Sequence, residues 1–289
     1  MPFPQTLEAK PKIIFFTDFD GTITLKDSND WMTDNLGFGQ EKRRQGNLDT
    51  LHDKVTFRES FQDMMDSVKQ PFPECIRLLC ENIKLDPYFN DFYQWSRQVG
   101  VPVIVLSSGM TPIIRGLLVH LIGPEANDIE IVSNEVVDRP PKKKEEEGGW
   151  QIQFHDDSGF GHDKSLTIRP YAKHFEAHPD EPKPVMLYAG DGKPNCPGRS
   201  LNTGACLVLA VSSQTLPGVS DLSAARETDL LFAKEGYDLV VYCQKQGIPY
   251  TTFKDWQSIM ATTKAIFEGK TTVKEVAAES AEKAKQGKD

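Results

Sequence analysis

The chain has 289 residues, 38% of them hydrophobic and 26% charged, which is typical of a globular protein with one large or two modest domains. Its formal net charge of −9 disfavours a nucleic-acid-binding protein, because neutralising phosphates needs clustered Lys and Arg. The apolar runs are far shorter than the roughly 20 residues of a membrane span, and the first ten residues lack the pattern of a secretion signal. We therefore expect no nucleic-acid partner, no membrane and a cytoplasmic location.

Short, continuous apolar runs alternate with amphipathic segments, a pattern typical of strands that are buried on both faces and separated by helices. Strands are predicted at 12–18, 101–107, 184–191, 230–234 and 238–243. Two more, at 129–138 and 149–157, flank a charged loop. The expected fold class is α/β, a Rossmann-like doubly wound parallel sheet.

Residues 28–85 differ from the rest, since they show helical patterns and no convincing strand. Helices are predicted at 29–37, 56–68 and 71–83, and another at 111–123 returns across the sheet. We interpret this organisation as a Rossmann-like catalytic core with an inserted helical cap and a polar tail that is a frayed helix or disordered. The predicted bounds are 1–28 and 86–269 for the core, 29–85 for the cap and 270–289 for the tail.

The first chemical motif is DFDGT at 18–22, which follows the first predicted strand. Asp18 and Asp20 stand at the carboxyl end of this strand and face the crevice where open α/β sheets bind ligands, and Gly21 lets the chain turn behind them. One carboxylate could attack a substrate while the other moves a proton. An ordinary turn after a strand is the alternative interpretation, since Asp and Gly are common there.

Three further motifs follow later elements in order. Ser107, Ser108 and Gly109 offer hydroxyls and backbone N–H groups to phosphate oxygens. Lys164 follows an aspartate that can cap a helix and can direct its ammonium into the same crevice. Asp191 lies in a Gly-Asp-Gly turn of the kind that holds a metal ion. Each motif alone is compatible with an ordinary turn or helix entry, but their order along the chain favours a functional site.

Together these motifs resemble those of the haloacid dehalogenase superfamily of phosphohydrolases, and most of all its phosphoserine phosphatase-like branch, which has a helical cap between the first two motifs. The resemblance covers nearly the whole chain. It implies that Asp18 attacks phosphorus to form an aspartyl-phosphate, and that Asp20 protonates the leaving oxygen and then activates water. It also implies that Ser107 and Lys164 hold the phosphoryl group, and that Mg²⁺ is bound by Asp18, Asp191 and the backbone carbonyl of Asp20.

The cap is expected to select the substrate, because the core motifs contact only phosphate. In phosphoserine phosphatases a carboxylate nine residues after the nucleophile contacts the substrate's amino group, and Asp27 has that position here. Those enzymes hold the serine carboxylate with an arginine seven residues after a phenylalanine. If Phe57 is that phenylalanine, the matching residue is Met64, and Arg58 is the nearest arginine. This departure predicts a small phosphomonoester without an amino acid carboxylate, because such a carboxylate calls for a bidentate arginine.

The segment DFDGTITLKDSND is also similar to methionine-salvage phosphatases that act on a methylthio-ketopentenyl phosphate. In that case Met64 and Met65 would pack on a thioether, and ordinary core filling is the alternative.

The predicted function is Mg²⁺-dependent hydrolysis of a small phosphorylated metabolite through an aspartyl-phosphate. Two alternatives stay open. One is a weak or inactive pseudophosphatase with an interrupted metal loop, and the other is a phosphotransferase or phosphomutase that uses the same nucleophile. The sequence makes no prediction of the oligomeric state.

The interruption lies directly after the Gly-Asp-Gly turn. Joining residues 188–192 to 219–225 gives YAGDGVSDLSAA, which restores the family's second aspartate, Asp221, as a further metal-site residue. Residues 193–218 are therefore predicted to be an insertion. Asp221 can join the metal site only if this segment loops out and returns.

Two interpretations of residues 193–218 stay open, a translated intron and a genuine surface insertion. The codons for Gly192-Lys193 can read G-GTAAG, a typical intron start, and those for Pro217-Gly218 can read CCAG-G, a typical intron end. Removing the piece between would restore one glycine codon and the reading frame.

Overall fold

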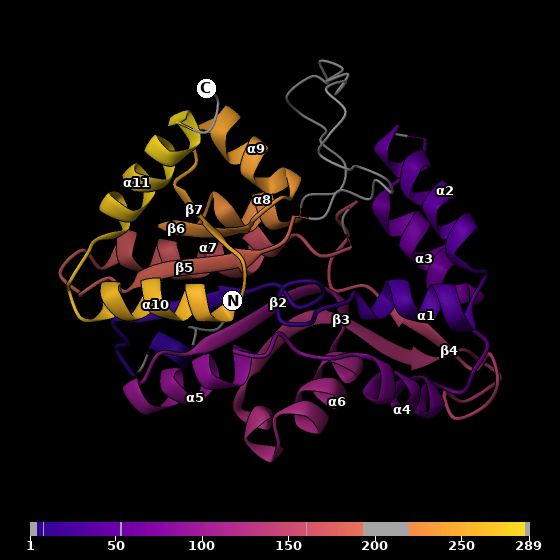
Figure 1. Ribbon diagram of the computed structural model, residues 1–289. Helices are drawn as coiled ribbons and strands as arrows, with labels where there is room; N and C mark the ends of the chain where they lie inside the picture. Colours follow the sequence, from indigo (N-terminus) through magenta and orange to yellow (C-terminus); the bar gives the residue numbers. More distant parts are fainter. Residues whose placement is uncertain (1–4, 8, 53, 160, 193–219, 287–289) are drawn as a thin grey trace.

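The computed structural model describes residues 5–7, 9–52, 54–159, 161–192 and 220–286 (Figure 1). Its centre is a seven-stranded sheet in the order β4-β3-β2-β1-β5-β6-β7. The strands are β1 (Ile13–Thr17), β2 (Val103–Met110), β3 (Glu130–Asp138), β4 (Trp150–Gln153), β5 (Val185–Gly190), β6 (Leu230–Lys234) and β7 (Tyr250–Phe253). All neighbours pair in parallel except β4, which is antiparallel to β3 at one edge. The predicted α/β fold is confirmed.

Helices cover both faces of the sheet, which explains why its strands are apolar throughout. Alternate residues of β1 belong to different cores, Ile13 and Phe15 to one and Ile14 and Phe16 to the other. The first core is closed by α5 (Phe89–Val99), α6 (Thr111–Leu121) and α10 (Trp256–Phe267). The second is closed by α7 (Lys164–Ala177), α8 (Ser220–Ala225) and α9 (Asp238–Gln246).

Four helices lie between β1 and α5 in the chain: α1 (Ser28–Leu36), α2 (Gln40–Leu51), α3 (Phe57–Ser67) and α4 (Phe72–Asn82). In Figure 1, α1, α2 and α3 stand together at the right of the view, to one side of the central sheet. We call the segment α1 to α4 the cap. Asp27 caps α1, and Thr56 with Glu59 forms a capping box at α3. The predicted helices at 29–37, 56–68, 71–83 and 111–123 are confirmed as α1, α3, α4 and α6.

Helix α2 was not predicted, because it has no apolar period. Its buried positions, Arg43, Asn47 and Thr50, follow helical spacing but are polar. Arg43 forms ion pairs with Asp30 at 3.0 Å and Asp34 at 2.6 Å, which anchor α2 on α1.

The prediction of a strand at 238–243 was wrong. These residues belong to α9, which ends at Gly247 in the left-handed conformation (φ 66°), and the seventh strand is β7. A short apolar run does not by itself distinguish a strand from a buried helix. The other predicted strands match β1, β2, β3, β4, β5 and β6.

Within the predicted polar tail, the structure has a helix, α11 (Val273–Gln286), whose Ser280 hydroxyl donates to Thr251 of β7 at 3.0 Å. Among the helices of the described residues, none has both the length and the apolar character to cross a membrane. The predicted insertion at 193–218 lies outside the described residues.

Candidate active site

A cleft lies at the carboxyl ends of β1, β2 and β5, where the cap faces the sheet. The core residues that line it come from four places in the chain. They are Asp18 and Asp20 after β1, Ser107, Ser108 and Gly109 in β2, Asp191 after β5, and Asp221 in α8. The structure thus brings these sequence-predicted residues together.

Asp18 is fixed by both its backbone and its side chain. Its N–H donates to the Ala189 carbonyl of β5 at 2.8 Å, and its Oδ1 accepts from Lys164 Nζ at 2.7 Å. Burial raises the pKa of Asp18 to about 6, while the ammonium of Lys164 opposes the rise. The carboxylate therefore combines limited solvation with a fixed direction into the cleft.

Lys164 is 1% exposed and holds two further partners, Asp221 Oδ1 at 2.6 Å and the Tyr188 hydroxyl at 2.9 Å. Burial by itself lowers the pKa of this ammonium, but Asp18 and Asp221 raise it above its ordinary value. The lysine is therefore charged and oriented at the base of the cleft.

Tyr188 was missed by the sequence reasoning, which treated it as an apolar strand residue. Its hydroxyl donates to Asp221 Oδ1 at 2.5 Å and accepts from Lys164. The sequence does contain a signal, a tyrosine two residues before the Gly-Asp-Gly turn. A tyrosine that is buried there needs a hydrogen-bond partner for its hydroxyl, and the structure shows that it is fully buried.

Asp20 is held by the start of α1. Its Oδ1 accepts from the N–H of Ser28 at 2.7 Å, and its Oδ2 accepts from Asn29 Nδ2 at 2.9 Å. Burial raises the pKa of Asp20 well above its ordinary value, with the nearby charge of Asp27 as the next cause. Asn29 also lines the cleft and was not predicted.

The last residues of β2, where the strand pairing shifts register, offer donors to an anion. Ser107 Oγ accepts from the N–H of Gly109 at 2.9 Å, and Ser108 Oγ is buried without a hydrogen-bond partner among the described residues. A Cβ on Gly109 would lie 3.1 Å from Asp20 Oδ2, so glycine lets this end of β2 approach Asp20 closely. Behind it, buried His162 contacts the Ser107 carbonyl through Nδ1 at 2.9 Å, and burial lowers the pKa of this histidine to about 4.

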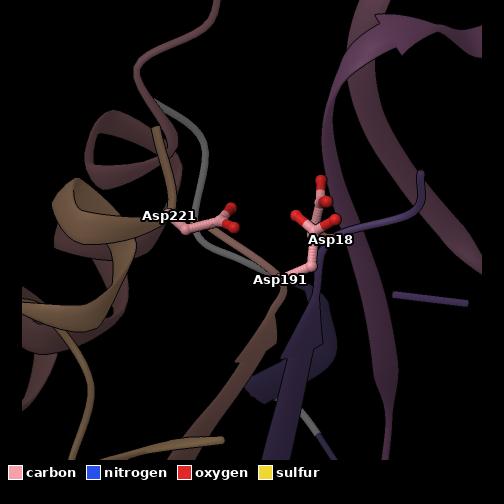
Figure 2. A group of neighbouring side chains, drawn as sticks. All are labelled: Asp18, Asp191 and Asp221. Carbon is pink, nitrogen blue, oxygen red and sulfur yellow. The ribbon is translucent and has the colours of Figure 1, made fainter. Parts of the chain in front are cut away.

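The residues fit a hard divalent cation. Asp18, Asp191 and Asp221 each present a carboxylate oxygen, and these oxygens lie within 4.8 Å of one another (Figure 2). All three carboxylates are buried, and Lys164 supplies a single positive charge beside them. Carboxylate oxygens are the ligands that Mg²⁺ prefers, and a divalent cation would balance the remaining charge. The side chain of Asp20 lies outside this group, since it accepts from Ser28 and Asn29.

Asp221 reaches this group although it stands far from Asp191 in the chain. Its Oδ2 accepts from the N–H of Gly192 at 2.8 Å. A Cβ on Gly190 would lie 2.6 Å from the same oxygen, so the glycine makes room for the carboxylate. The described residues on the two sides of 193–219 therefore meet at the site.

We expect a variant that lacks residues 193–218 to keep its fold, because Gly192 and Asp221 are already in contact and two residues can join them. In the wild type 28 residues, 193–220, connect Gly192 to Asp221, whereas in the variant only residues 219 and 220 do. The shorter loop should raise the free energy of unfolding by about 2 kcal/mol, because it loses less entropy when it closes. A short connection also holds Asp221 more firmly, so we expect tighter Mg²⁺ binding and faster phosphomonoester hydrolysis. Urea unfolding, calorimetric Mg²⁺ titration and steady-state kinetics measure these effects.

A second variant, with 193–218 replaced by a Gly/Ser linker of equal length, separates the effect of length from that of sequence. A deletion variant that is misfolded or inactive, beside a fully active parent, would show that the segment belongs to the working enzyme. Transcript sequencing without a splice junction at this place would exclude the intron interpretation.

The cap residues predicted to contact substrate lie in different places. Asp27 is half-buried, caps α1 through the N–H groups of Asn29 and Asp30 at 2.9 Å, and lines the cleft. Met64 and Met65 both pack in the core, and Met64 also lines the cleft.

Arg58 is not among the described residues that line the cleft. Its Nη1 donates to the Asp156 carbonyl at 2.5 Å, and its guanidinium stacks over the Phe154 ring at 4.3 Å. These contacts tie α3 to the segment after β4, so the guanidinium of Arg58 is engaged in holding the cap to the core.

Comparisons with known proteins agree with this geometry. A model of the haloacid dehalogenase-like hydrolase family matches residues 15–193. Polyol phosphate phosphatase PYP1 of Saccharomyces cerevisiae is 45% identical over 268 residues, which cover 92% of this chain and 98% of that protein. The 2-hydroxy-3-keto-5-methylthiopentenyl-1-phosphate phosphatase of Bacillus cereus is 24% identical over 264 residues, with coverage of 88% and 97%.

A solved phosphoserine phosphatase, a phospho-aspartyl intermediate analogue, has a similar structure, with a TM-score of 0.54 and 13% identity. The similarity covers 87% of this chain and 98% of that one, and it shows the shared fold. From the matched family model and the extent of its similarity to the yeast relative, the chain belongs to the haloacid dehalogenase-like hydrolases and is a phosphatase.

Proposed function

We propose that this phosphatase hydrolyses a small polyol phosphate with Mg²⁺ as cofactor, through an aspartyl-phosphate on Asp18. The observation that carries the mechanism is the placement of Asp18, buried at the end of β1, facing the cleft, and 2.7 Å from the ammonium of Lys164. The substrate class follows the yeast relative, which is a polyol phosphate phosphatase.

In the first step a carboxylate oxygen of Asp18 bonds to phosphorus, and the bond from phosphorus to the substrate's alkoxy oxygen breaks. Asp20 gives its proton to that oxygen, so the alcohol leaves uncharged. Lys164 and the donors of Ser107, Ser108 and Gly109 hold the phosphoryl oxygens during the transfer.

In the second step a water oxygen bonds to phosphorus while Asp20, now a carboxylate, takes the water's proton. The bond from phosphorus to Asp18 breaks, which restores the Asp18 carboxylate and releases inorganic phosphate. The contacts of Asp20 with Ser28 and Asn29 keep one carboxyl group in position for both proton transfers.

Asp18, Asp191 and Asp221 would hold Mg²⁺, with the Asp20 backbone carbonyl that the family resemblance adds. When bound, the ion supplies positive charge against the phosphoryl oxygens, which phosphoryl transfer needs more than it needs covalent chemistry.

The cleft favours a substrate without a carboxylate. If Phe57 is the phenylalanine of the family pattern, Met64 lies where the phosphoserine phosphatases have an arginine. Apart from Lys164, which pairs with Asp18 beneath the cleft, the described residues at the cleft include no arginine or lysine. A substrate carboxylate would therefore lack a bidentate partner.

The wild-type protein should hydrolyse p-nitrophenyl phosphate in the presence of Mg²⁺ and lose that activity with EDTA. Across a panel of metabolite phosphates, kcat/KM should be higher for polyol phosphates than for phosphoserine. Equal or better kcat/KM for phosphoserine would contradict the substrate class, and activity that persists after metal removal would contradict the role of Mg²⁺.

The same assay decides between hydrolysis and the two alternatives. A pseudophosphatase would release no phosphate from p-nitrophenyl phosphate. A phosphotransferase would release less inorganic phosphate than p-nitrophenol when an alcohol acceptor is added, whereas a hydrolase keeps the two products equal.

A further inference from the structure

Two buried polar side chains of the cap line the cleft without a protein partner. Asn47 of α2 is 7% exposed and Ser60 of α3 is 9% exposed. Neither side chain has a hydrogen bond to another described residue. Their polar atoms are not among the described side-chain atoms that are buried without a partner, so they stay open to the cleft, where a ligand can take the place of water.

Helices α2 and α3 approach each other closely where these residues lie. A Cβ on Gly46, the residue before Asn47, would lie 3.0 Å from Ser60 Oγ. Beside them, the rings of Phe57 and Phe61 stack with centroids 5.5 Å apart, and both rings line the cleft. The cap wall therefore combines an apolar surface with two hydrogen-bonding side chains.

The charge of this wall disfavours a second anionic group on the substrate, because Asp27 and Asp30 line it. Arg43, the cation buried nearby on α2, already pairs with Asp30 at 3.0 Å and Asp34 at 2.6 Å. An amide and a hydroxyl can each both donate and accept, which is the pattern that substrate hydroxyls require. A second anionic group on the substrate would find no cation among the described lining residues.

We infer that Asn47 and Ser60 bind hydroxyl groups on the carbon chain of the substrate and so select a polyol phosphate over an alkyl phosphate of equal length. The inference rests on the proposed function and assigns the residues that make the enzyme specific for polyol phosphates. Asn47 and Ser60 act at the far end of the substrate from the phosphoryl group, which the core motifs hold.

The test compares kcat/KM for a hexitol phosphate with that for n-hexyl phosphate, which has the same carbon chain without the hydroxyls. We expect the ratio of the two values to fall roughly 3- to 10-fold in Asn47→Leu and in Ser60→Ala, as the loss of one hydrogen bond requires. The loss should come through a higher KM for the hexitol phosphate. Asn35→Leu, at an exposed site on α1, is the matched control and should keep the wild-type ratio.

Suppose that the wild-type enzyme prefers the hexitol phosphate. If the ratio is then unchanged in both variants, this inference is overturned and the proposed function stands. If Asn47→Leu does not fold, Ser60→Ala decides alone, since it removes a single oxygen atom. A wild-type enzyme that shows no preference for the hexitol phosphate, or that prefers O-phosphoethanolamine, would overturn the proposed substrate class and the inference with it.

Discussion

Asp18→Asn should lower kcat for any phosphomonoester by about 10⁴-fold or more, because it removes the attacking carboxylate on which both steps depend. The fold should survive. Asparagine has nearly the same shape, and Lys164 keeps Asp221 and the Tyr188 hydroxyl as partners. Steady-state kinetics, a thermal melt and intact-mass analysis after rapid quenching in acid would show a folded protein that carries no phosphate.

Asp63→Asn is the matched control for this variant. Asp63 is exposed on α3, so the same chemical change there should leave kcat at the wild-type value. Near-native activity in Asp18→Asn would exclude Asp18 as the nucleophile and with it the aspartyl-phosphate mechanism.

The sequence motifs were enough to predict most residues of the cleft, because the topology of the sheet brings the ends of its central strands together. Parallel strands end at one edge of a sheet, so a motif placed after each strand arrives at the same crevice whatever its distance along the chain. Asp18, Ser107 and Asp191 were predicted on this ground, and Lys164 was predicted as the residue after a helix-capping aspartate. Each lies at the cleft or in contact with a residue that lines it. Asp221 needed one further step, the rejoining of the interrupted fourth motif.

The residues that the sequence did not identify are polar groups whose role depends on tertiary contacts. Asn29 and Tyr188 look like ordinary helix and strand residues until the fold places them beside Asp20 and Asp221. Asn47 is harder still, since it lies on α2, a helix that buries polar residues and therefore shows no apolar period. The cap residues proposed to select the substrate were thus less predictable from the sequence than the core residues proposed to carry out the reaction.

The prediction of a strand where α9 lies, in place of β7, has a different cause. The apolar run at 238–243 fits either a strand or a buried helix, and only the glycine at 247 and the following short run at 250–253 separate the two. This misassignment left the site prediction unaffected, because neither α9 nor β7 contributes a described residue that lines the cleft.

Asp20→Asn should slow turnover of an alkyl phosphate by about 10²- to 10⁴-fold, the usual contribution of a positioned acid and base. The site is built to hold this carboxyl, since Ser28 N–H and Asn29 Nδ2 each donate to one of its oxygens. Asparagine would turn an NH₂ group toward one of these donors and could neither give nor take the proton. Formation of the phosphoenzyme should suffer less with p-nitrophenyl phosphate, because p-nitrophenolate leaves without a proton whereas an alkoxide needs one.

With p-nitrophenyl phosphate the second step should therefore limit Asp20→Asn, and phosphorylated protein should accumulate. Rapid acid quenching followed by intact-mass analysis measures that fraction, and the initial burst of p-nitrophenol gives an independent count of the same species. Asn29→Asp offers a comparison, because it keeps the volume of the side chain but replaces its donor with a second carboxylate beside Asp20. If Asp20→Asn turns over both substrates at the wild-type rate and accumulates no phosphoenzyme, Asp20 is not the acid and base, and another group must carry the proton.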